Sequence, residues 1–341
     1  SAGTNGTNGF TGSLGYTGSL GYTGSASTVA GFTGSQGYYG SVGYTGSGAL
    51  AATPTILGTV FGYTTGNGNT FIGCCSGNTT QSGANNLAIG CLTLKDNTTG
   101  CNNIAIGYQA LTVNNTGTFN TAIGYQSLFF NTTGSGNTAI GRSSLVNNTT
   151  GSNNTAIGYG ALYNNTTGNY NTAIGYAALF SNSSGINNLA IGCQALYNNT
   201  VGNGNLAIGS AALPNNTTGC DNLAVGYGAL FNSKTGSGNI AIGCIALHEN
   251  TAGCYNVAIG VQALYNTTIG TNNTALGYFA LYNNTTGSCN IAIGTNALAI
   301  NYTGCGNIAI GESALYYNTS GYNNLGIGRG SLGNNQTGNY N

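Results

Sequence analysis

The chain carries almost no charge. Of its 341 residues, four are Lys or Arg and four are Asp or Glu, so the formal net charge is zero. Proteins that bind nucleic acid through its phosphates need clustered basic side chains, and so do segments that bind anionic membrane surfaces. The apolar runs are also much shorter than the roughly 18 to 20 residues that a membrane-spanning helix requires. We therefore expect no nucleic-acid partner and no membrane insertion.

Groups that could perform catalysis or hold a metal are equally rare. The single histidine, His248, stands next to Glu249 and is expected to form a solvated surface pair. The other carboxylates, Asp96, Asp221 and Glu312, are widely separated, so no pair suited to acid and base catalysis is indicated. The ten cysteines include no C-x-x-C motif of the kind that binds zinc. The sequence predicts no catalytic residue, no metal site and no cofactor, and we expect the protein not to be an enzyme.

What the chain has in abundance is a 17-residue repeat. Residues 147–179, NNTTGSNNTAIGYGALYNNTTGNYNTAIGYAAL, contain nearly the same sequence twice. With Ile157 as a marker, the template reads N-T-A-I-G-Y-x-A-L-Y-N-N-T-T-G-x-x and recurs in sixteen copies without an insertion. The equivalent markers are Ile72, Ile89, Ile106, Ile123, Ile140, Ile174, Ile191, Ile208, Val225, Ile242, Ile259, Leu276, Ile293, Ile310 and Ile327.

This repeat predicts an all-β protein. A 17-residue unit is too short for a pair of helices, and each of its two glycines would cost a helix about 1 kcal/mol. T-A-I-G is typical of a short strand, and N-N-T-T-G is typical of a turn. One unit cannot bury its Ile and Leu alone, so successive units are expected to stack as a parallel β-solenoid or β-roll of sixteen coils.

Stacking at a fixed period places identical residues above one another. We expect ladders of Ile and Leu inside the coil, and ladders of Asn whose side-chain amides hydrogen-bond along the axis. The pattern leaves open whether Tyr159 and Tyr176 face inward or outward, because each follows a Gly that can turn the chain. The residues that represent the predicted structural ladders are Asn154, Asn171, Ile157, Ile174, Gly158, Gly168 and Leu162.

The first 48 residues follow a different period. Glycine recurs at every third residue, as in GFTGSLGYTGSLGYTGS, with an interruption at residues 25–30. A collagen triple helix needs this spacing because only Gly fits near its axis, although neither Pro54 nor Pro214 lies in the segment. A collagen-like trimeric stem, an extended arm docked on a neighbouring molecule and a disordered leader are all open interpretations. We divide the chain into this segment at 1–48, a connector or cap at 49–66 and the solenoid at 67–341.

The N-T-A-I-G core of the repeat, for example Asn154 to Gly158, resembles a known group of fibre repeats. It is similar to the head repeats of trimeric autotransporter adhesins and, more closely, to repeats of phage tail-fibre proteins. The resemblance covers roughly residues 67–341, and the Gly-X-Y segment resembles collagen-like segments found beside such fibres. It implies a parallel β-roll, usually trimeric, that binds surfaces. The unit here is longer than the usual adhesin-head repeat.

The ten cysteines allow two interpretations. Cys74 and Cys91 occupy the same position in adjacent repeats, so a disulfide between them is geometrically feasible in a stack of coils. Most other cysteines have no counterpart at the equivalent position of an adjacent repeat. We expect mainly thiols that are partly buried, with a Cys74–Cys91 disulfide as the alternative.

Many asparagines in the turn segments begin N-x-S/T sequons, and ten of them are singled out as candidates for glycan attachment. Turn chemistry alone explains Asn and Thr at these places, but a row of acceptors on an exposed edge would also allow glycans to coat the rod. The candidate glycan-attachment residues are Asn97, Asn114, Asn131, Asn148, Asn165, Asn182, Asn198, Asn266, Asn301 and Asn318.

These patterns favour a structural role outside the cell. We expect a subunit of an extracellular fibre, at a cell surface or on a virion, that self-associates as a homotrimer or as a head-to-tail filament. The alternative is an adhesin that binds cell-surface glycans or proteins through its repeated Tyr and Asn rows. Ice binding through the row that contains Thr155 and Thr172 is a minor alternative, because residues such as Leu189 and Ile240 interrupt that row.

Overall fold

The computed structural model describes residues 55–57, 60–64 and 67–341, and describes side-chain burial from residue 67 onward. The chain divides into two compact units, Ser1–Cys74 and Cys75–Asn341. The predicted Gly-X-Y segment at 1–48 and most of the predicted connector at 49–66 lie outside the described residues.

The described part of the first unit is a small antiparallel sheet. It consists of β2 (Thr55–Leu57), β3 (Val60–Thr64) and β4 (Thr70–Ile72), in which β2 pairs with β3 and β3 pairs with β4. Strand β4 contains Ile72, the marker of the first repeat. Ile72 pairs with Gly62 of β3. This first copy therefore takes part in an antiparallel pairing that the sequence did not predict, because the preceding residues supply a strand of their own.

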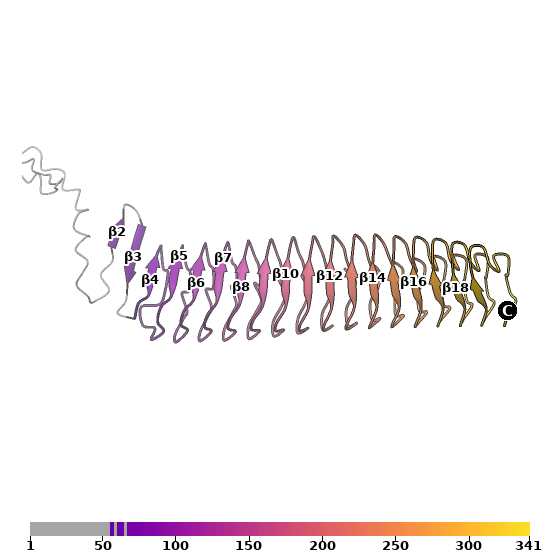
Figure 1. The fold of residues 1–341 in the computed structure, drawn as a ribbon. Coiled ribbons are helices and arrows are strands. Elements are labelled where there is room, and N and C mark those ends of the chain that lie inside the picture. The colour runs from indigo at the N-terminus through magenta and orange to yellow at the C-terminus, as the bar shows by residue number, and fades with distance from the viewer. Residues whose placement is uncertain (1–54, 58–59, 65–66) are drawn as a thin grey trace, which may run out of the picture. The chain divides into compact units, whose positions relative to one another are not determined.

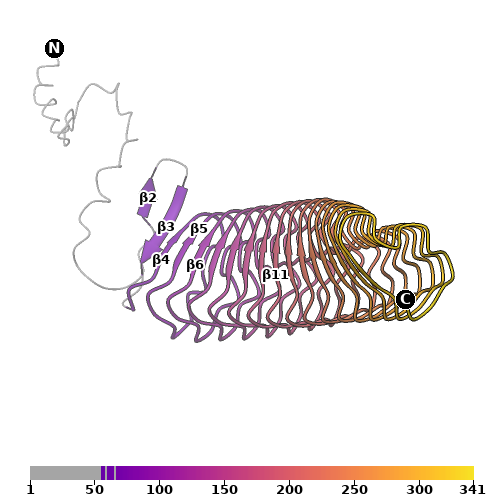
Figure 2. The ribbon, with the colours of Figure 1, turned by 45° about the vertical axis from the view of Figure 1, so that its right-hand side comes forward.

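The second unit is a parallel β-solenoid, in which each repeat contributes one three-residue strand (Figure 1). Fifteen strands follow one another in sequence order along the stack, and Figure 2, an oblique view, shows the coils as similar loops stacked one behind another. The described residues contain no helix. The strands are β5 (Leu87–Ile89), β6 (Ile104–Ile106), β7 (Thr121–Ile123), β8 (Thr138–Ile140), β9 (Thr155–Ile157), β10 (Thr172–Ile174), β11 (Leu189–Ile191), β12 (Leu206–Ile208), β13 (Leu223–Val225), β14 (Ile240–Ile242), β15 (Val257–Ile259), β16 (Thr274–Leu276), β17 (Ile291–Ile293), β18 (Ile308–Ile310) and β19 (Leu325–Ile327).

The register of the strands equals the repeat length. Strand β10 pairs with β9 through Thr172 opposite Thr155 and Ile174 opposite Ile157. The same offset of 17 residues joins every consecutive pair from β5 to β19, for example Leu189 of β11 opposite Leu206 of β12. The predicted all-β parallel solenoid is therefore confirmed for this unit.

The core contains fewer large aliphatic side chains than predicted. In strands β5 to β18 the central Ala points inward, so Ala156 and Ala173 are fully buried, and Leu162 is fully buried as well. Ile157 and Ile174 are only half-buried, on the outer face of the sheet. The expectation that the Ile ladder lies inside is wrong, because side chains alternate along a strand and the inward place is taken by Ala.

Two glycines in each repeat are required by close contacts between coils. Gly158 has a φ of 131°, and a Cβ atom there would lie 2.5 Å from the carbonyl oxygen of Gly175 in the next coil. A Cβ atom on Gly168 would collide with the carbonyl oxygen of Gly185 and with Asn165 Oδ1. Any larger residue would push the coils apart, which explains why both positions are Gly in every copy.

Candidate binding surface

The predicted row of glycan-attachment residues lies mostly inside the solenoid. Asn165 is fully buried, and its side-chain amide donates to Asn148 Oδ1 at 2.8 Å and to the Gly168 carbonyl at 3.0 Å. Asn182 donates in turn to Asn165 Oδ1 at 2.7 Å. The expectation of an exposed row is wrong for these positions, because each amide is held by its own turn and by the preceding coil. The fully buried members are Asn97, Asn114, Asn131, Asn148, Asn165, Asn182, Asn301 and Asn318.

The two remaining candidates for glycan attachment are half-buried. Asn198 donates its side-chain amide to Asn215 Oδ1 at 3.1 Å, and Asn266 donates to Asn283 Oδ1 at 2.7 Å. They belong to an outer amide row, one residue before the buried one, rather than to a row of unpaired acceptors.

A second buried amide ladder begins each strand. Asn154 Nδ2 donates to Asn137 Oδ1 at 3.1 Å and to the Gly168 carbonyl at 2.8 Å. The Asn171 backbone N–H donates to Asn154 Oδ1 at 2.9 Å. The Gly168 carbonyl therefore accepts from both ladders at once, through Asn154 and Asn165. Since buried polar groups are costly unless they are paired, these two lines of amides fix both the register and the shape of the coil.

The cysteines form no disulfide among the described residues, and neither Cys74 nor Cys91 takes part in one. The expected partial burial holds for Cys91 and the three other half-exposed thiols, whereas the rest are exposed. The half-exposed cysteines are Cys91, Cys101, Cys220 and Cys254, and the exposed ones are Cys74, Cys75, Cys193, Cys244, Cys289 and Cys305.

One row of aromatic side chains follows the marker by two residues and faces outward. Tyr159 and Tyr176 are each about half exposed, with ring centroids 5.4 Å apart and planes 9° apart. Tyr108 and Tyr125 stack in the same way at 5.4 Å. Arg142 fills the step between the two pairs, with its guanidinium carbon 5.3 Å from the Tyr125 centroid and 5.7 Å from the Tyr159 centroid. Stacking and cation–π contacts therefore run continuously over five coils.

A second aromatic row, six residues after the marker, was not recognised in the sequence. Tyr163, Phe180 and Tyr197 stack at 5.0 and 5.2 Å, with planes 10° and 8° apart. The signal was present in the sequence, because the same repeat position carries Phe, Tyr or His in several consecutive copies. We call this row the inner aromatic ladder, and it continues with Phe231, His248, Tyr265 and Tyr282 at spacings of 5.0, 5.1 and 5.3 Å.

His248 is a member of this ladder and not a freely solvated side chain. Its Nδ1 lies 2.7 Å from Glu249 Oε1, and only 19% of its side chain is exposed. The other Glu249 carboxylate oxygen accepts from the Asn232 amide at 2.8 Å. Burial raises the pKa of the neighbouring Tyr265, and the Glu249 carboxylate and the Tyr282 phenol act in the same direction.

In both rows the flat faces of the rings are used by neighbouring rings. Only ring edges are then available to a ligand, except where the ladder is interrupted. At the same repeat position Phe129 precedes Tyr163, with Val146 between them, and Pro214 lies between Tyr197 and Phe231. Val146 and Pro214 fill these steps of the ladder with their own side chains, whereas Ala299 fills its step with a single methyl group. The ladder therefore lacks one ring between Tyr282 and Tyr316.

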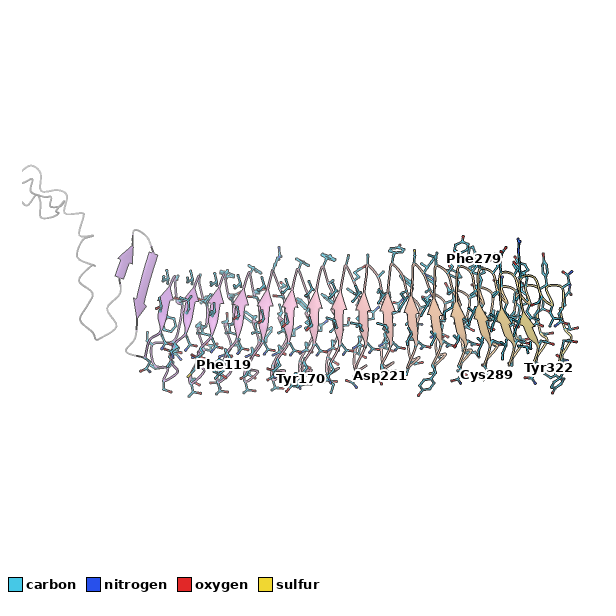
Figure 3. The ribbon with its side chains drawn as sticks, viewed as in Figure 1. Phe119, Tyr170, Asp221, Phe279, Cys289 and Tyr322 are labelled. Carbon is cyan, nitrogen blue, oxygen red and sulfur yellow. The ribbon has the colours of Figure 1, made fainter. Side chains whose placement is uncertain are left out.

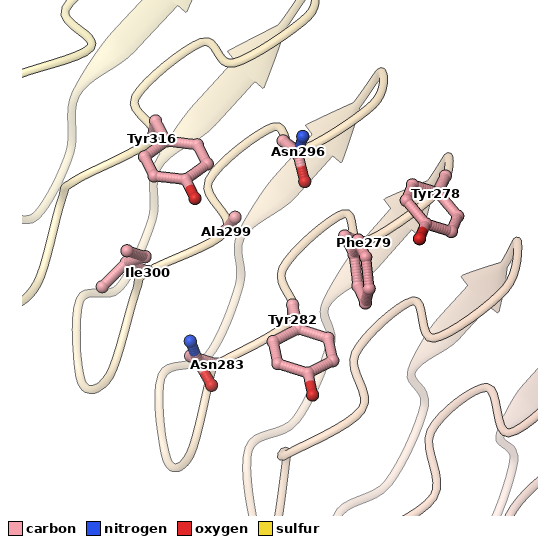
Figure 4. Close-up of a pocket in the computed structure, with 8 residues that line it drawn as sticks. All are labelled: Tyr278, Phe279, Tyr282, Asn283, Asn296, Ala299, Ile300 and Tyr316. Carbon is pink, nitrogen blue, oxygen red and sulfur yellow. The ribbon is translucent and has the colours of Figure 1, made fainter.

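This missing ring leaves a cavity of about 410 Å³ (Figure 4). Its walls include Tyr282 on one side and Tyr316 on the other, and Ala299 lies between them. Phe279 packs its ring edge to face with Tyr282, with planes 89° apart and centroids 4.8 Å apart. Asn283 and Asn296 also line the cavity. Its volume lies within the range of small-molecule sites, although it is open to solvent at the surface.

The two edges of the solenoid carry different side chains (Figure 3). Phe119, Tyr170, Asp221 and Cys289 project along one edge, and Phe279 projects from the opposite edge. The first four occupy the same repeat position, where the backbone has a φ of about 57° to 61°. The cavity at Ala299 is lined by Phe279 and is therefore separate from the row of Phe119 and Tyr170.

Residues 67–341 and the short strands before them contain no group of three or more His, Cys, Asp or Glu side chains that could hold a metal ion. Within the same part of the chain, no helix has the length and apolarity needed to cross a bilayer.

Comparison of the chain with protein-family models, with curated proteins and with solved structures found no match. The features of the molecule that bear on its function are therefore the solenoid itself, its outward faces and the cavity at Ala299.

Proposed function

We propose that the protein is a structural subunit of an extracellular fibre, with the solenoid as a stiff shaft. The observation that carries this proposal is the uninterrupted repetition of the same strand register through β5 to β19, reinforced by two buried amide ladders. At the usual spacing of about 4.8 Å per strand, fifteen coils give a rod of about 70 Å. Bending such a rod stretches many equivalent hydrogen bonds at once, so stiffness follows from the architecture.

The outer face of the sheet supports self-association. It carries two half-exposed side chains per strand, and many of them are aliphatic, such as Ile259 and Ile293 at 38% and 37% exposure. Contiguous apolar surface of this kind is typical of interaction sites. A second copy presents the same row at the same spacing, so two or three rods would be complementary in register. We propose a homotrimer that associates through this face.

Association along the axis is the second mode that we propose. The coils of a second molecule would stack on those of the first in the strand register that joins β18 to β19 within the chain. Both modes of assembly produce a filament or fibre, and the extracellular location is proposed together with that role.

Electron micrographs of the purified protein, combined with sedimentation velocity over a hundredfold range of concentration, test the proposal. We expect rods of uniform width that contain more than one chain. The double variant Ile259→Lys/Ile293→Lys should lower the particle mass measured by sedimentation toward that of a single chain. The matched pair Ile186→Lys and Ile269→Lys, which changes exposed isoleucines of the loops, should leave the mass unchanged. A single-chain particle at every concentration would contradict the fibre role.

A further inference from the structure

We propose that the gap in the inner aromatic ladder at Ala299 binds one pyranose ring of a neutral glycan, specifically a ring whose hydroxyl groups are equatorial. This site is independent of the fibre role, since it requires only the coils of a single chain. The ring would enter between Tyr282 and Tyr316 and occupy the step that Ala299 leaves empty.

The width of the gap fits one ring. Consecutive members of the ladder are separated by 5.0 to 5.3 Å, so the two coil-to-coil steps from Tyr282 to Tyr316 amount to about 10 Å along the axis. A ring inserted midway would therefore meet one aromatic face on each side at the normal spacing of the ladder. Val146 and Pro214 deny this space to a ligand at the other interruptions, because their side chains fill more of the step.

The ring faces of Tyr282 and Tyr316 favour a ligand with an apolar surface on both sides. Tyr265 stacks on one face of Tyr282, so the opposite side of the Tyr282 ring is the one directed toward the gap. A pyranose with equatorial hydroxyls carries axial C–H groups on both faces, and these slightly positive hydrogens suit the negative faces of aromatic rings. Its hydroxyl groups then lie around the rim of the ring, away from the two Tyr faces.

Two side-chain amides are placed to meet that rim. Asn283 accepts from Asn266, but the next member of its row is Ile300, so no protein acceptor follows for the Asn283 amide hydrogens. Asn296 also lines the cavity, and its side chain forms no hydrogen bond with another described residue, whereas its backbone N–H donates to the Tyr278 carbonyl at 2.9 Å. Each amide offers both a donor and an acceptor, which is the combination that sugar hydroxyls require.

The lining favours a neutral sugar over other rings. None of the residues around the cavity is charged, so a sugar acid or a phosphate would lose its hydration without gaining a counter-ion. An aromatic side chain of a partner would also match the width of the gap. It would leave the Asn283 and Asn296 amides without partners at the ring edge, and an apolar ring that buries unpaired amides binds less well.

Titrations followed by saturation-transfer NMR test the site, with methyl β-glucoside and cellobiose as the probes. We expect both to bind, and methyl α-mannoside and methyl β-galactoside, each with one axial ring hydroxyl, to bind at least fivefold more weakly. N-acetyltyrosinamide is the aromatic competitor. Tighter binding of this competitor than of cellobiose would overturn the sugar assignment in favour of an aromatic partner. Absence of binding by both gluco-configured probes would overturn the site itself.

Variants locate the binding. Ala299→Tyr supplies the missing ring and should abolish the signal, while Val146→Tyr makes the same addition at another interruption of the ladder and should leave it unchanged. Asn296→Gly removes one amide without disturbing the backbone, because Gly160 occupies the equivalent position of another repeat, and it should weaken binding about fivefold to tenfold. Circular dichroism and thermal unfolding confirm that each variant is folded. Undiminished binding by folded Ala299→Tyr would show that the sugar binds elsewhere and overturn the proposal.

Discussion

The side-chain amide of Asn250 lies 3.4 Å from the hydroxyl oxygen of Ser233, whereas the equivalent amide of Asn148 lies 2.7 Å from Asn131 Oδ1. Ser233 interrupts the buried ladder because it is too short to bond in both directions. As a result, Asn216 Oδ1 in the preceding coil is buried and has no hydrogen-bond partner. Thr267 produces the same defect at Asn250 Oδ1. The buried amide ladder is therefore interrupted at Ser233 and at Thr267, and the Asn found at this position in other repeats would restore the missing hydrogen bonds.

Ser233→Asn should stabilise the solenoid. The new amide would donate to Asn216 Oδ1 and accept from Asn250, which adds one buried hydrogen bond and shortens another. We expect the free energy of unfolding to rise by about 1 to 2 kcal/mol, measured by urea titration followed by circular dichroism. Ser233→Ala is the control, and it should be neutral or destabilising. Equal stability of the Asn and Ala variants would show that the ladder contributes nothing at this step.

The two kinds of glycine in the repeat should respond very differently to the same substitution. Gly158→Ala places a Cβ atom 2.5 Å from a backbone oxygen of the next coil, so we expect a loss of about 3 kcal/mol or more. Gly160→Ala should cost only about 1 to 2 kcal/mol, the cost of the left-handed conformation itself, because Ala177 and Ala211 already occupy the equivalent position at a φ of 51° and 52°. The difference between the unfolding midpoints of the two variants measures the destabilisation caused by the clash with Gly175. Similar midpoints for both variants would contradict the close approach of Gly158 and Gly175.

The period of the sequence was sufficient to predict the fold class, but not the direction of each side chain. Strand, register and stacking follow from the 17-residue spacing alone, and Ile157 lies opposite Ile174 as expected. The inward residue was misassigned because hydrophobicity ranks Ile above Ala, whereas the narrow coil leaves room only for Ala156 at that place. The result is an exposed aliphatic row that a hydrophobicity argument places in the core.

The turns were harder to predict than the strands. Leu162 has a φ of 53°, in the left-handed region that Leu rarely adopts, and the same is true of its equivalents along the solenoid. Adopting that conformation costs about 1 to 2 kcal/mol, which burial of the Leu side chain offsets with about 1.5 to 3 kcal/mol. The buried place of Asn165 depends on this turn, so a sequon pattern alone could not distinguish it from an exposed acceptor. The gap at Ala299 was likewise visible only after the ladder itself was recognised.

Alkaline pH should destabilise the protein through Tyr265. The pKa of Tyr265 is raised above the value of 10.0 for a free side chain, so the folded state holds the phenolic proton more tightly than the unfolded state. Its contribution to stability is complete below about pH 10 and is lost as the pH rises through the raised pKa. We expect the unfolding free energy to fall more steeply above pH 10 in the wild-type protein than in Tyr265→Phe.

A further variant separates the causes of this pH dependence. Glu249→Gln removes the neighbouring carboxylate and should reduce the dependence without eliminating it, because burial is the larger cause. A Tyr265→Phe protein with the wild-type slope would show that other tyrosines determine the alkaline behaviour.

Glycan occupancy should follow burial and not the sequon pattern when the chain is produced in a host that glycosylates secreted proteins. Asn165 is fully buried and its Nδ2 already donates twice, so a glycan there is incompatible with the folded coil. Asn153 also begins a sequon, Asn153-Asn154-Thr155, but lies exposed on the loop edge. Peptide mass spectrometry of the folded fraction should detect glycan on Asn153 and none on Asn165. Occupied Asn165 in protein with the normal circular dichroism spectrum would contradict the buried amide ladder, because attachment to Nδ2 removes a hydrogen that the ladder uses.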